Sequence, residues 1–294
     1  MKRLAVYCLP VILVLIAADR AFPQTTTYVP INSHAAVTTT LPFRLYWGYL
    51  VIVEGSIGDR RKLAFLVDTG ANPSAVDQKI ARSLRLAEQP ARVNLSNTSV
   101  QTPIAVLPSL RVGPLYVESL PVLTEDLSFY QKALGQEVDA IVGMDVLRKS
   151  SFSINYKAKE MLFGPIGTLQ FAAPFDTELP VVTIQMELQA RQVRVVIDTG
   201  TPDLMLLKSH MSGLAGFRTL GTEEVSDVSG SFRRTKVQIP DVYLGQARIG
   251  QQVAFVVADR KDEGDYFDGV LGFRGTHFRK IAFDFEHHRF SWER

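Results

Sequence analysis

The feature that most constrains the fold is a short motif that the chain contains twice. Residues 65–71 read FLVDTGA and residues 195–201 read VVIDTGT. In each copy, an apolar run typical of a buried strand leads into an aspartate and then into a glycine that ends the strand in a turn. A carboxylate at the end of a buried strand is costly unless it is paired or used. One copy could be a chance turn sequence, but two copies with matching surroundings indicate chemistry.

The surroundings of the two motifs do match. Gly143 lies 75 residues after Asp68, and Gly272 lies 74 residues after Asp198. Each glycine ends a second apolar run, which reads DAIVG in the first copy and DGVLG in the second. The chain after its N-terminal region is therefore a duplicated unit of about 130 residues, a size that suits one domain with its own core.

Two Asp-Thr-Gly strand ends, each followed by an apolar-apolar-Gly signature, resemble the pepsin/retropepsin family of aspartic proteases over roughly residues 43–293. The units are short, so the sequence resembles compact bacterial retropepsin-like proteins more than full-length pepsins. The resemblance implies a mostly β fold with two similar retropepsin-like β-barrel lobes, short helices and a catalytic cleft between the lobes. It also implies an aspartic endopeptidase, a hydrolase that needs no cofactor and no metal.

The chemistry expected of such a pair follows from electrostatics. Two carboxyl groups that face each other at about 3 Å cannot both ionise easily, so Asp68 and Asp198 would share one proton. One of them draws a proton from a water molecule, which attacks a peptide carbonyl, and the other donates a proton to the carbonyl oxygen. The residues alone do not decide which aspartate is the base, because the pKa values belong to the pair.

Five residues next to the aspartates are expected to support them. Gly70 and Gly200 would let backbone amides approach the carboxyl groups, and by resemblance the Thr69 and Thr199 hydroxyls would reach across to the partner strand. By the same resemblance Thr201 would donate its hydroxyl to the second carboxyl.

The first copy has Ala71 where the second has Thr201. A hydrogen bond to an ionised carboxylate lowers its pKa, so the missing donor should raise the pKa values of the pair. We therefore expect a mildly acidic optimum, roughly pH 4–6.

The pattern of segments predicts five parts of the chain. Residues 1–21 are a signal peptide or N-terminal anchor, 22–42 a flexible linker, 43–165 the first lobe, 166–178 the connection and 179–294 the second lobe. Within the lobes, we expect one strand over 44–53, a helix over 73–84 and a hairpin within 223–238, with Gly230 at its tip.

That hairpin is the candidate flap over the cleft, through Ser229, Gly230 and Ser231. The corresponding first-lobe segment, residues 94–100, has neither the tyrosine of a pepsin flap nor a glycine.

The N-terminus predicts export. A basic start precedes an apolar run over residues 4–18, so the protein would be periplasmic or secreted, or anchored in a membrane through this run if the signal is not cleaved. The only cysteine, Cys8, lies within the run, so the mature form would hold no disulfide. Residues 22–40 contain no lysine or arginine, so we expect no basic segment that masks the acidic pair.

Other classes of function were weighed against the protease. A formal net charge of +2 gives no electrostatic footprint for nucleic acid, and the histidines show no spacing of metal ligands. We interpret Asp139 and Asp268 as polar residues at strand edges, and Gly143 and Gly272 as packing residues. We expect a monomer that acts on a peptide or protein substrate. A non-catalytic peptide-binding or inhibitor module on the same fold is the alternative, and a structural envelope protein is the third.

Overall fold

The computed structural model describes residues 38–94, 99–211, 216–227, 230–258 and 267–294, and most of these residues lie in β-strands. Residues 1–37, with the predicted signal and most of the linker, lie outside the described part. In the described ranges, no helix is long and apolar enough to cross a membrane.

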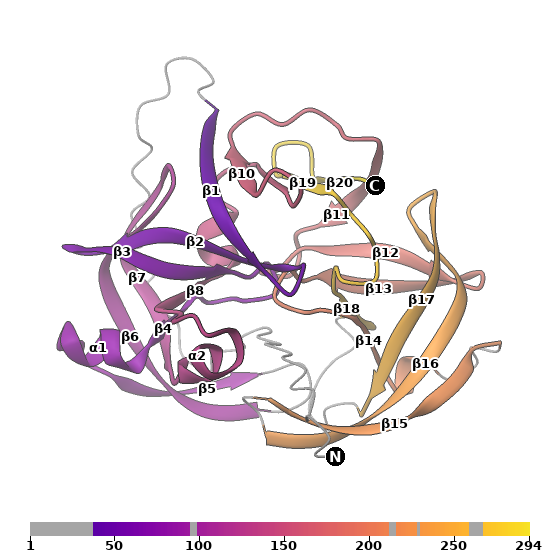
Figure 1. Cartoon of the computed structure of the whole chain (residues 1–294), viewed down its shortest axis with the longest axis horizontal. Helices are drawn as coiled ribbons and strands as arrows, with labels where there is room; N and C mark the ends of the chain where they lie inside the picture. The colour runs from indigo at the N-terminus through magenta and orange to yellow at the C-terminus, as the bar shows by residue number, and fades with distance from the viewer. Residues whose placement is uncertain (1–37, 95–98, 212–215, 228–229, 259–266) are drawn as a thin grey trace.

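The first unit consists of short strands and three helices (Figure 1). In chain order these are β1 (Thr39–Tyr46), β2 (Leu50–Ile57), β3 (Arg60–Val67), β4 (Ala75–Asp77), α1 (Gln78–Ser83), β5 (Gln89–Asn94), β6 (Ser99–Val112), β7 (Leu115–Glu125), α2 (Ser128–Leu134), β8 (Ala140–Val142), α3 (Met144–Leu147), β9 (Phe152–Asn155) and β10 (Glu160–Phe163).

The second unit follows the same plan. Its elements are β11 (Phe171–Asp176), β12 (Thr183–Leu188), β13 (Arg191–Ile197), β14 (Leu204–Leu207), the 3-10 helix η1 (Ser209–Met211), β15 (Arg218–Asp227), β16 (Gly230–Leu244), β17 (Ala247–Val257), β18 (Gly269–Leu271), β19 (Lys280–Asp284) and β20 (Arg289–Glu293).

Strand pairing repeats between the two units. In the first, β3 runs parallel to β8 and β4 runs parallel to β7, while β4 and β8 are antiparallel. In the second, β13 runs parallel to β18 and β14 runs parallel to β17, while β14 and β18 are antiparallel. The duplication read from the motifs therefore extends to the pairing of strands that carry no motif.

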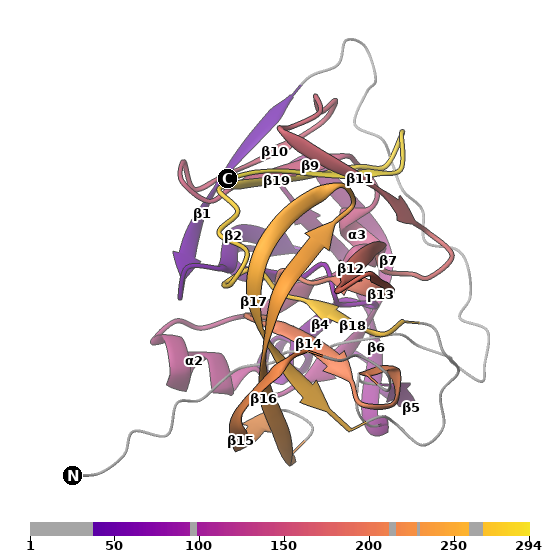
Figure 2. The ribbon, with the colours of Figure 1, turned by 90° about the vertical axis from the view of Figure 1, so that its right-hand side faces the viewer.

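A further sheet joins the two units. It runs in the order β1, β10, β9, β19, β20 and β11, all antiparallel, so each unit contributes strands to it. Figures 1 and 2 show these strands grouped together above the two units. Their fully buried aromatic rings pack closely, with ring centroids 4.8 Å apart for Phe152 and Phe283 and 5.6 Å apart for Phe290 and Trp292. This aromatic core fixes one unit to the other.

The structure corrects three of the expected elements. The strand predicted over residues 44–53 is two strands, because Trp47 and Gly48 adopt positive φ angles of 51° and 80° and turn the chain back. The helix predicted from residue 73 begins only at Gln78, and Asp77 caps its N-terminus by accepting a hydrogen bond from the Lys79 amide at 2.7 Å. The connection predicted over residues 166–178 contains strand β11, which is part of the shared sheet.

Candidate active site

The two aspartates occupy equivalent places at the ends of β3 and β13. The Asp68 amide continues the parallel pairing by donating to the Val142 carbonyl at 3.0 Å, and the Asp198 amide donates to the Leu271 carbonyl at 3.1 Å. Each aspartate thus follows the buried end of a strand, which holds its backbone firmly. In each unit, the short apolar strand before the signature glycine, Gly143 or Gly272, fixes the position of the aspartate backbone.

The carboxyl groups of Asp68 and Asp198 lie together. Both residues have no exposed surface. A Cβ atom added at Gly70 would lie 2.5 Å from the carboxyl carbon of Asp198, and one added at Gly200 would collide with the Asp68 carboxyl. Each carboxyl therefore lies against the glycine that follows the opposite aspartate, and any side chain at either glycine would push the pair apart.

Hydrogen bonds leave one oxygen of each carboxyl free for its partner. Oδ1 of Asp68 accepts the Gly70 amide at 2.9 Å, and Oδ1 of Asp198 accepts the Gly200 amide at 2.7 Å. Both Oδ2 atoms are buried, and neither has another donor in the described part of the chain. A single proton held between the two carboxyls satisfies these oxygens.

Burial raises the pKa of both carboxyls. Burial raises the pKa of Asp68 well above its ordinary value, and the charge of Asp198 raises it further. Burial also raises the pKa of Asp198, to about 6, while hydrogen bonds from Thr201 and Asp68 oppose the rise. The two carboxyls therefore titrate as a pair, and both bind a proton more readily than an isolated aspartate does.

Thr69 and Thr199 link the two units directly beneath the carboxyls. The Thr69 hydroxyl donates to the Ile197 carbonyl at 2.7 Å and accepts the Thr199 amide at 3.1 Å. The Thr199 hydroxyl donates to the Val67 carbonyl at 2.9 Å and accepts the Thr69 amide at 3.1 Å. All four hydrogen bonds cross between the units, so the distance between the two Asp-Thr-Gly loops is fixed by a reciprocal arrangement.

The residues that follow Gly70 and Gly200 differ, because the first copy has Ala71 and the second has Thr201. Thr201 is buried beside Asp198, and its hydroxyl lowers the pKa of that carboxyl. Its Oγ1 nevertheless has no partner in good hydrogen-bond geometry among the described residues, so the contact is a loose one. Ala71 is also buried and offers Asp68 only its backbone.

A polar contact behind each aspartate loop was not predicted from the sequence. In the first unit, Asp145 accepts the Ser74 hydroxyl at 2.6 Å, and the Ser74 hydroxyl oxygen accepts the Gly143 amide at 2.9 Å. In the second unit, Arg274 donates to Asp203 at 2.5 Å. Both contacts join the loop after Asp-Thr-Gly to the residues after the apolar-apolar-Gly signature. Residues 145 and 274 each lie two positions after the signature glycine, a shared spacing that could have pointed to them.

Asp139 and Asp268 accept hydrogen bonds from strand amides, which agrees with their interpretation as polar residues at strand edges. Oδ2 of Asp139 accepts the Ala64 amide at 2.7 Å, and Oδ2 of Asp268 accepts the Arg194 amide at 2.5 Å. Asp268 also contacts His210. In the described ranges, no group of three His, Cys, Asp or Glu side chains is placed to hold a metal ion.

Hairpins occur at equivalent places in both units. β5 pairs with β6 up to Asn94 and Ser99, and β15 pairs with β16 up to Asp227 and Gly230. The hairpin expected in the second unit is therefore present, with Gly230 as the first residue of its returning strand. Ser229 lies outside the described residues, and only the backbone of Gly230 and Ser231 is described. The role of this hairpin as a flap stays a prediction.

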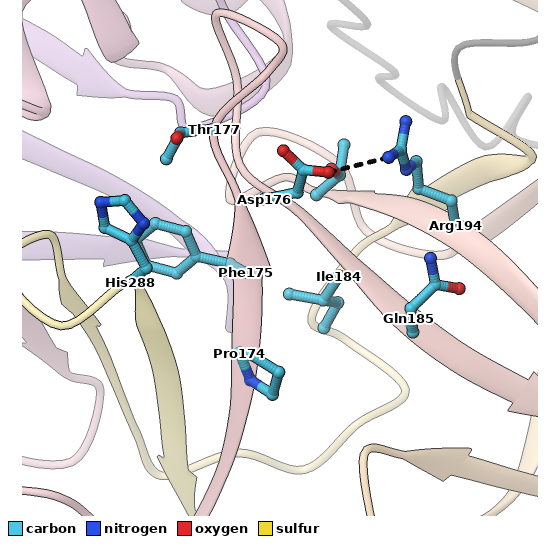
Figure 3. Close-up of a pocket in the computed structure, with 9 residues that line it drawn as sticks. Pro174, Phe175, Asp176, Thr177, Ile184, Gln185, Arg194 and His288 are labelled. Carbon is cyan, nitrogen blue, oxygen red and sulfur yellow. Dashed lines mark hydrogen bonds and ion pairs between the residues drawn. The ribbon is translucent and has the colours of Figure 1, made fainter.

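Two grooves lie beside the strands that lead to the aspartates, and neither is lined by Asp68 or Asp198. One, of about 340 Å³, is lined by Pro174, Phe175 and Arg194, and Figure 3 shows Arg194 reaching Asp176 across it. Arg194 precedes Asp198 by four residues, or about 13 Å along an extended strand. The other groove, of about 500 Å³, is lined by Pro42, Phe43 and other residues of the first unit. The Pro-Phe pairs sit at matching registers, so both grooves are products of the duplication and lie apart from the carboxyl pair.

One comparison with known proteins found a family that matches part of the chain. A family model described as aspartyl protease matches residues 53–146, which include Asp68, the apolar-apolar-Gly signature and Asp145. This match confirms the resemblance to the retropepsin-like aspartic proteases. A search of curated proteins returned no significant match.

Proposed function

We propose that the chain is an aspartic endopeptidase, in which the two units are the lobes of a retropepsin-like β-barrel pair and the substrate lies between them. One observation carries the proposal. Two carboxyls from separate copies of the motif lie against each other's glycine, fully buried, with raised pKa values and no other donor for their facing oxygens in the described part of the chain. Such an arrangement is costly for stability and suits acid–base chemistry.

In the proposed reaction, Asp198 is the base and Asp68 the acid. The Asp198 carboxylate takes a proton from a water molecule, whose oxygen attacks the carbonyl carbon of the peptide. The carbonyl oxygen takes the proton from Asp68, which gives a neutral diol intermediate. The intermediate then collapses as the nitrogen of the leaving amine takes a proton from Asp198 and the carbon–nitrogen bond breaks. Asp68 recovers its proton from the diol, so the pair returns to its starting state.

The assignment of roles rests on the asymmetry of the two environments. The Thr201 hydroxyl favours the ionised form of Asp198, and Ala71 offers no such hydroxyl to Asp68. The hydrogen bond between the carboxyls lowers the pKa of Asp198 and raises that of Asp68, as expected when Asp68 holds the proton.

Substrate and setting follow from the sequence. We infer a peptide or protein substrate, a monomeric enzyme without cofactor, and export to the periplasm or the exterior, with an anchor through residues 4–18 if the signal is kept.

Cleavage of a mixed peptide library by the purified protein, mapped by mass spectrometry, tests the proposal. We expect cleavage that a statine-containing peptide inhibits, because its hydroxyl mimics the diol intermediate, and that a metal chelator leaves unchanged. Binding of the statine peptide without cleavage of any library member would instead favour the peptide-binding or inhibitor module.

A further inference from the structure

A buried tyrosine on α2 has a hydroxyl that the fold itself does not use. Tyr130 is 1% exposed, and its Oη has no hydrogen-bond partner in the described part of the chain. Leaving a buried hydroxyl unpaired is costly, and such groups in a native protein call for an explanation. The ring packs edge-to-face against Phe129, with centroids 5.9 Å apart. A phenylalanine would keep this contact and avoid the cost.

The fold ties this tyrosine to the loop that carries Asp68. Strand β4, which follows that loop, runs parallel to the end of β7, and α2 begins three residues later. Oδ2 of Asp77, the last residue of β4, accepts the Leu127 amide at 3.0 Å. The Leu127 carbonyl in turn accepts the Tyr130 amide at 3.0 Å. These two hydrogen bonds therefore connect the backbone of Tyr130 to the strand that follows the Asp68 loop.

The charges of both carboxyls act on the Tyr130 hydroxyl. Burial raises its pKa well above the ordinary value, and the charges of Asp68, then Tyr49, then Asp198 raise it further. Tyr156 offers a contrast, because its hydroxyl is also buried without a described partner, yet burial alone raises its pKa. The Tyr130 hydroxyl thus stays protonated at every working pH and keeps its proton available for donation.

We propose that Tyr130 is a substrate-contacting residue of the active site, whose hydroxyl donates a hydrogen bond to a backbone oxygen of the peptide held at Asp68 and Asp198. This inference rests on the proposed function. It explains why the hydroxyl is present, buried and unpaired in the protein alone, because its partner arrives with the substrate. The facing oxygens of the two carboxyls and Thr201 Oγ1 lack described partners in the same way.

Tyr130→Phe tests the proposal, with Tyr156→Phe as the matched control. Steady-state cleavage of a library-derived peptide and the dissociation constant of a statine-containing peptide are measured for both variants and for the wild type. We expect Tyr130→Phe to lower kcat/KM and weaken statine binding between about 10-fold and 100-fold, the effect of one lost donor to a polar reacting group. Its thermal unfolding midpoint should equal or exceed that of the wild type, since only an unpaired hydroxyl is removed.

The control separates a substrate contact from a general packing effect. Tyr156→Phe should leave both kcat/KM and statine affinity unchanged. An active wild type with an equally active Tyr130→Phe variant would overturn the role of Tyr130 and leave the proposed function intact. Equal losses in both variants would also overturn it. A wild type that cleaves nothing would remove the proposed function, and this inference with it.

Discussion

At the residue scale, the two copies of the motif differ in the residue that follows Asp-Thr-Gly, and in the proposed mechanism this difference polarises the carboxyl pair. Thr201 lowers the pKa of Asp198, whereas Ala71 leaves Asp68 with backbone donors only. The sequence predicts raised pKa values from this asymmetry, and both values are raised, with burial as the largest cause. The pKa of about 6 for Asp198 places the expected acid limb of the kcat/KM profile near pH 6, so the optimum would lie above the range of roughly pH 4–6 expected from the sequence.

Substitutions at the two positions should move opposite limbs of that profile. Thr201→Val removes a hydroxyl that favours ionised Asp198, so the acid limb should move to higher pH. Ala71→Ser adds a hydroxyl beside Asp68, which holds the proton, so the alkaline limb should move to lower pH. Each shift should be up to about one pH unit, since one donor contributes about 1 kcal/mol. Profiles of kcat/KM against pH check this, and a shift of the same limb in both variants would contradict the assigned roles.

At the element scale, the strands set the spacing of the active site through a few cross-unit bonds. Parallel pairing of β3 with β8 and of β13 with β18 brings each aspartate to the end of a buried strand, and the two threonine hydroxyls then join the strand ends. Because every one of these groups is buried, an unmade hydrogen bond would carry its full desolvation cost.

Thr199→Val should therefore destabilise the protein. It leaves the Val67 carbonyl and the Thr69 amide without their buried partner, at a cost of about 2–5 kcal/mol in the free energy of unfolding. Thr201→Val, at a buried hydroxyl with no well-formed hydrogen bond, is the matched control and should cost less than about 1 kcal/mol. Chemical denaturation measures both. Similar losses in the two variants would show that the reciprocal hydrogen bonds contribute little.

At the scale of the whole molecule, the sequence predicts the architecture better than the contacts between elements. The duplication, the paired aspartates and most strands follow from periodic apolar runs and repeated spacings. The contact of Ser74 with Asp145, the turn at Trp47 and the burial of Tyr130 carry no periodic signal, because each depends on a single side chain and a distant partner. The strand within the connection, β11, was missed because its alternation is interrupted by Pro174 and flanked by turn-forming residues.

Carboxyls buried across the molecule should make its stability depend on pH. Burial raises the pKa of Asp68, Asp198 and Asp145 in the folded state. Between the ordinary value of 3.8 and the raised value, the folded state binds more protons than the unfolded state, so stability is full below about pH 4 and falls as pH rises. For Asp198, a rise to about 6 corresponds to about 3 kcal/mol lost by pH 8.

Unfolding free energies measured by denaturation between pH 4 and pH 8 check this. The wild type should lose stability across the range, and the double variant Asp68→Asn with Asp198→Asn should lose less, because its neutral amides have no charge to bury. Both proteins should retain part of the dependence of unfolding free energy on pH, because both contain Asp145. A wild type that gains stability towards pH 8 would contradict the raised pKa values.

The most direct test of a shared-proton aspartic mechanism is the activity of the two single variants, Asp68→Asn and Asp198→Asn, on a peptide that the wild type cleaves. A pair that acts as a unit fails when either member is lost, so each variant should lose at least about 1,000-fold in kcat. Thermal unfolding midpoints at pH 7 should stay at or above that of the wild type, which shows that the fold is kept. If either folded variant cleaved the peptide at the wild-type rate, the two carboxyls would not be the catalytic pair.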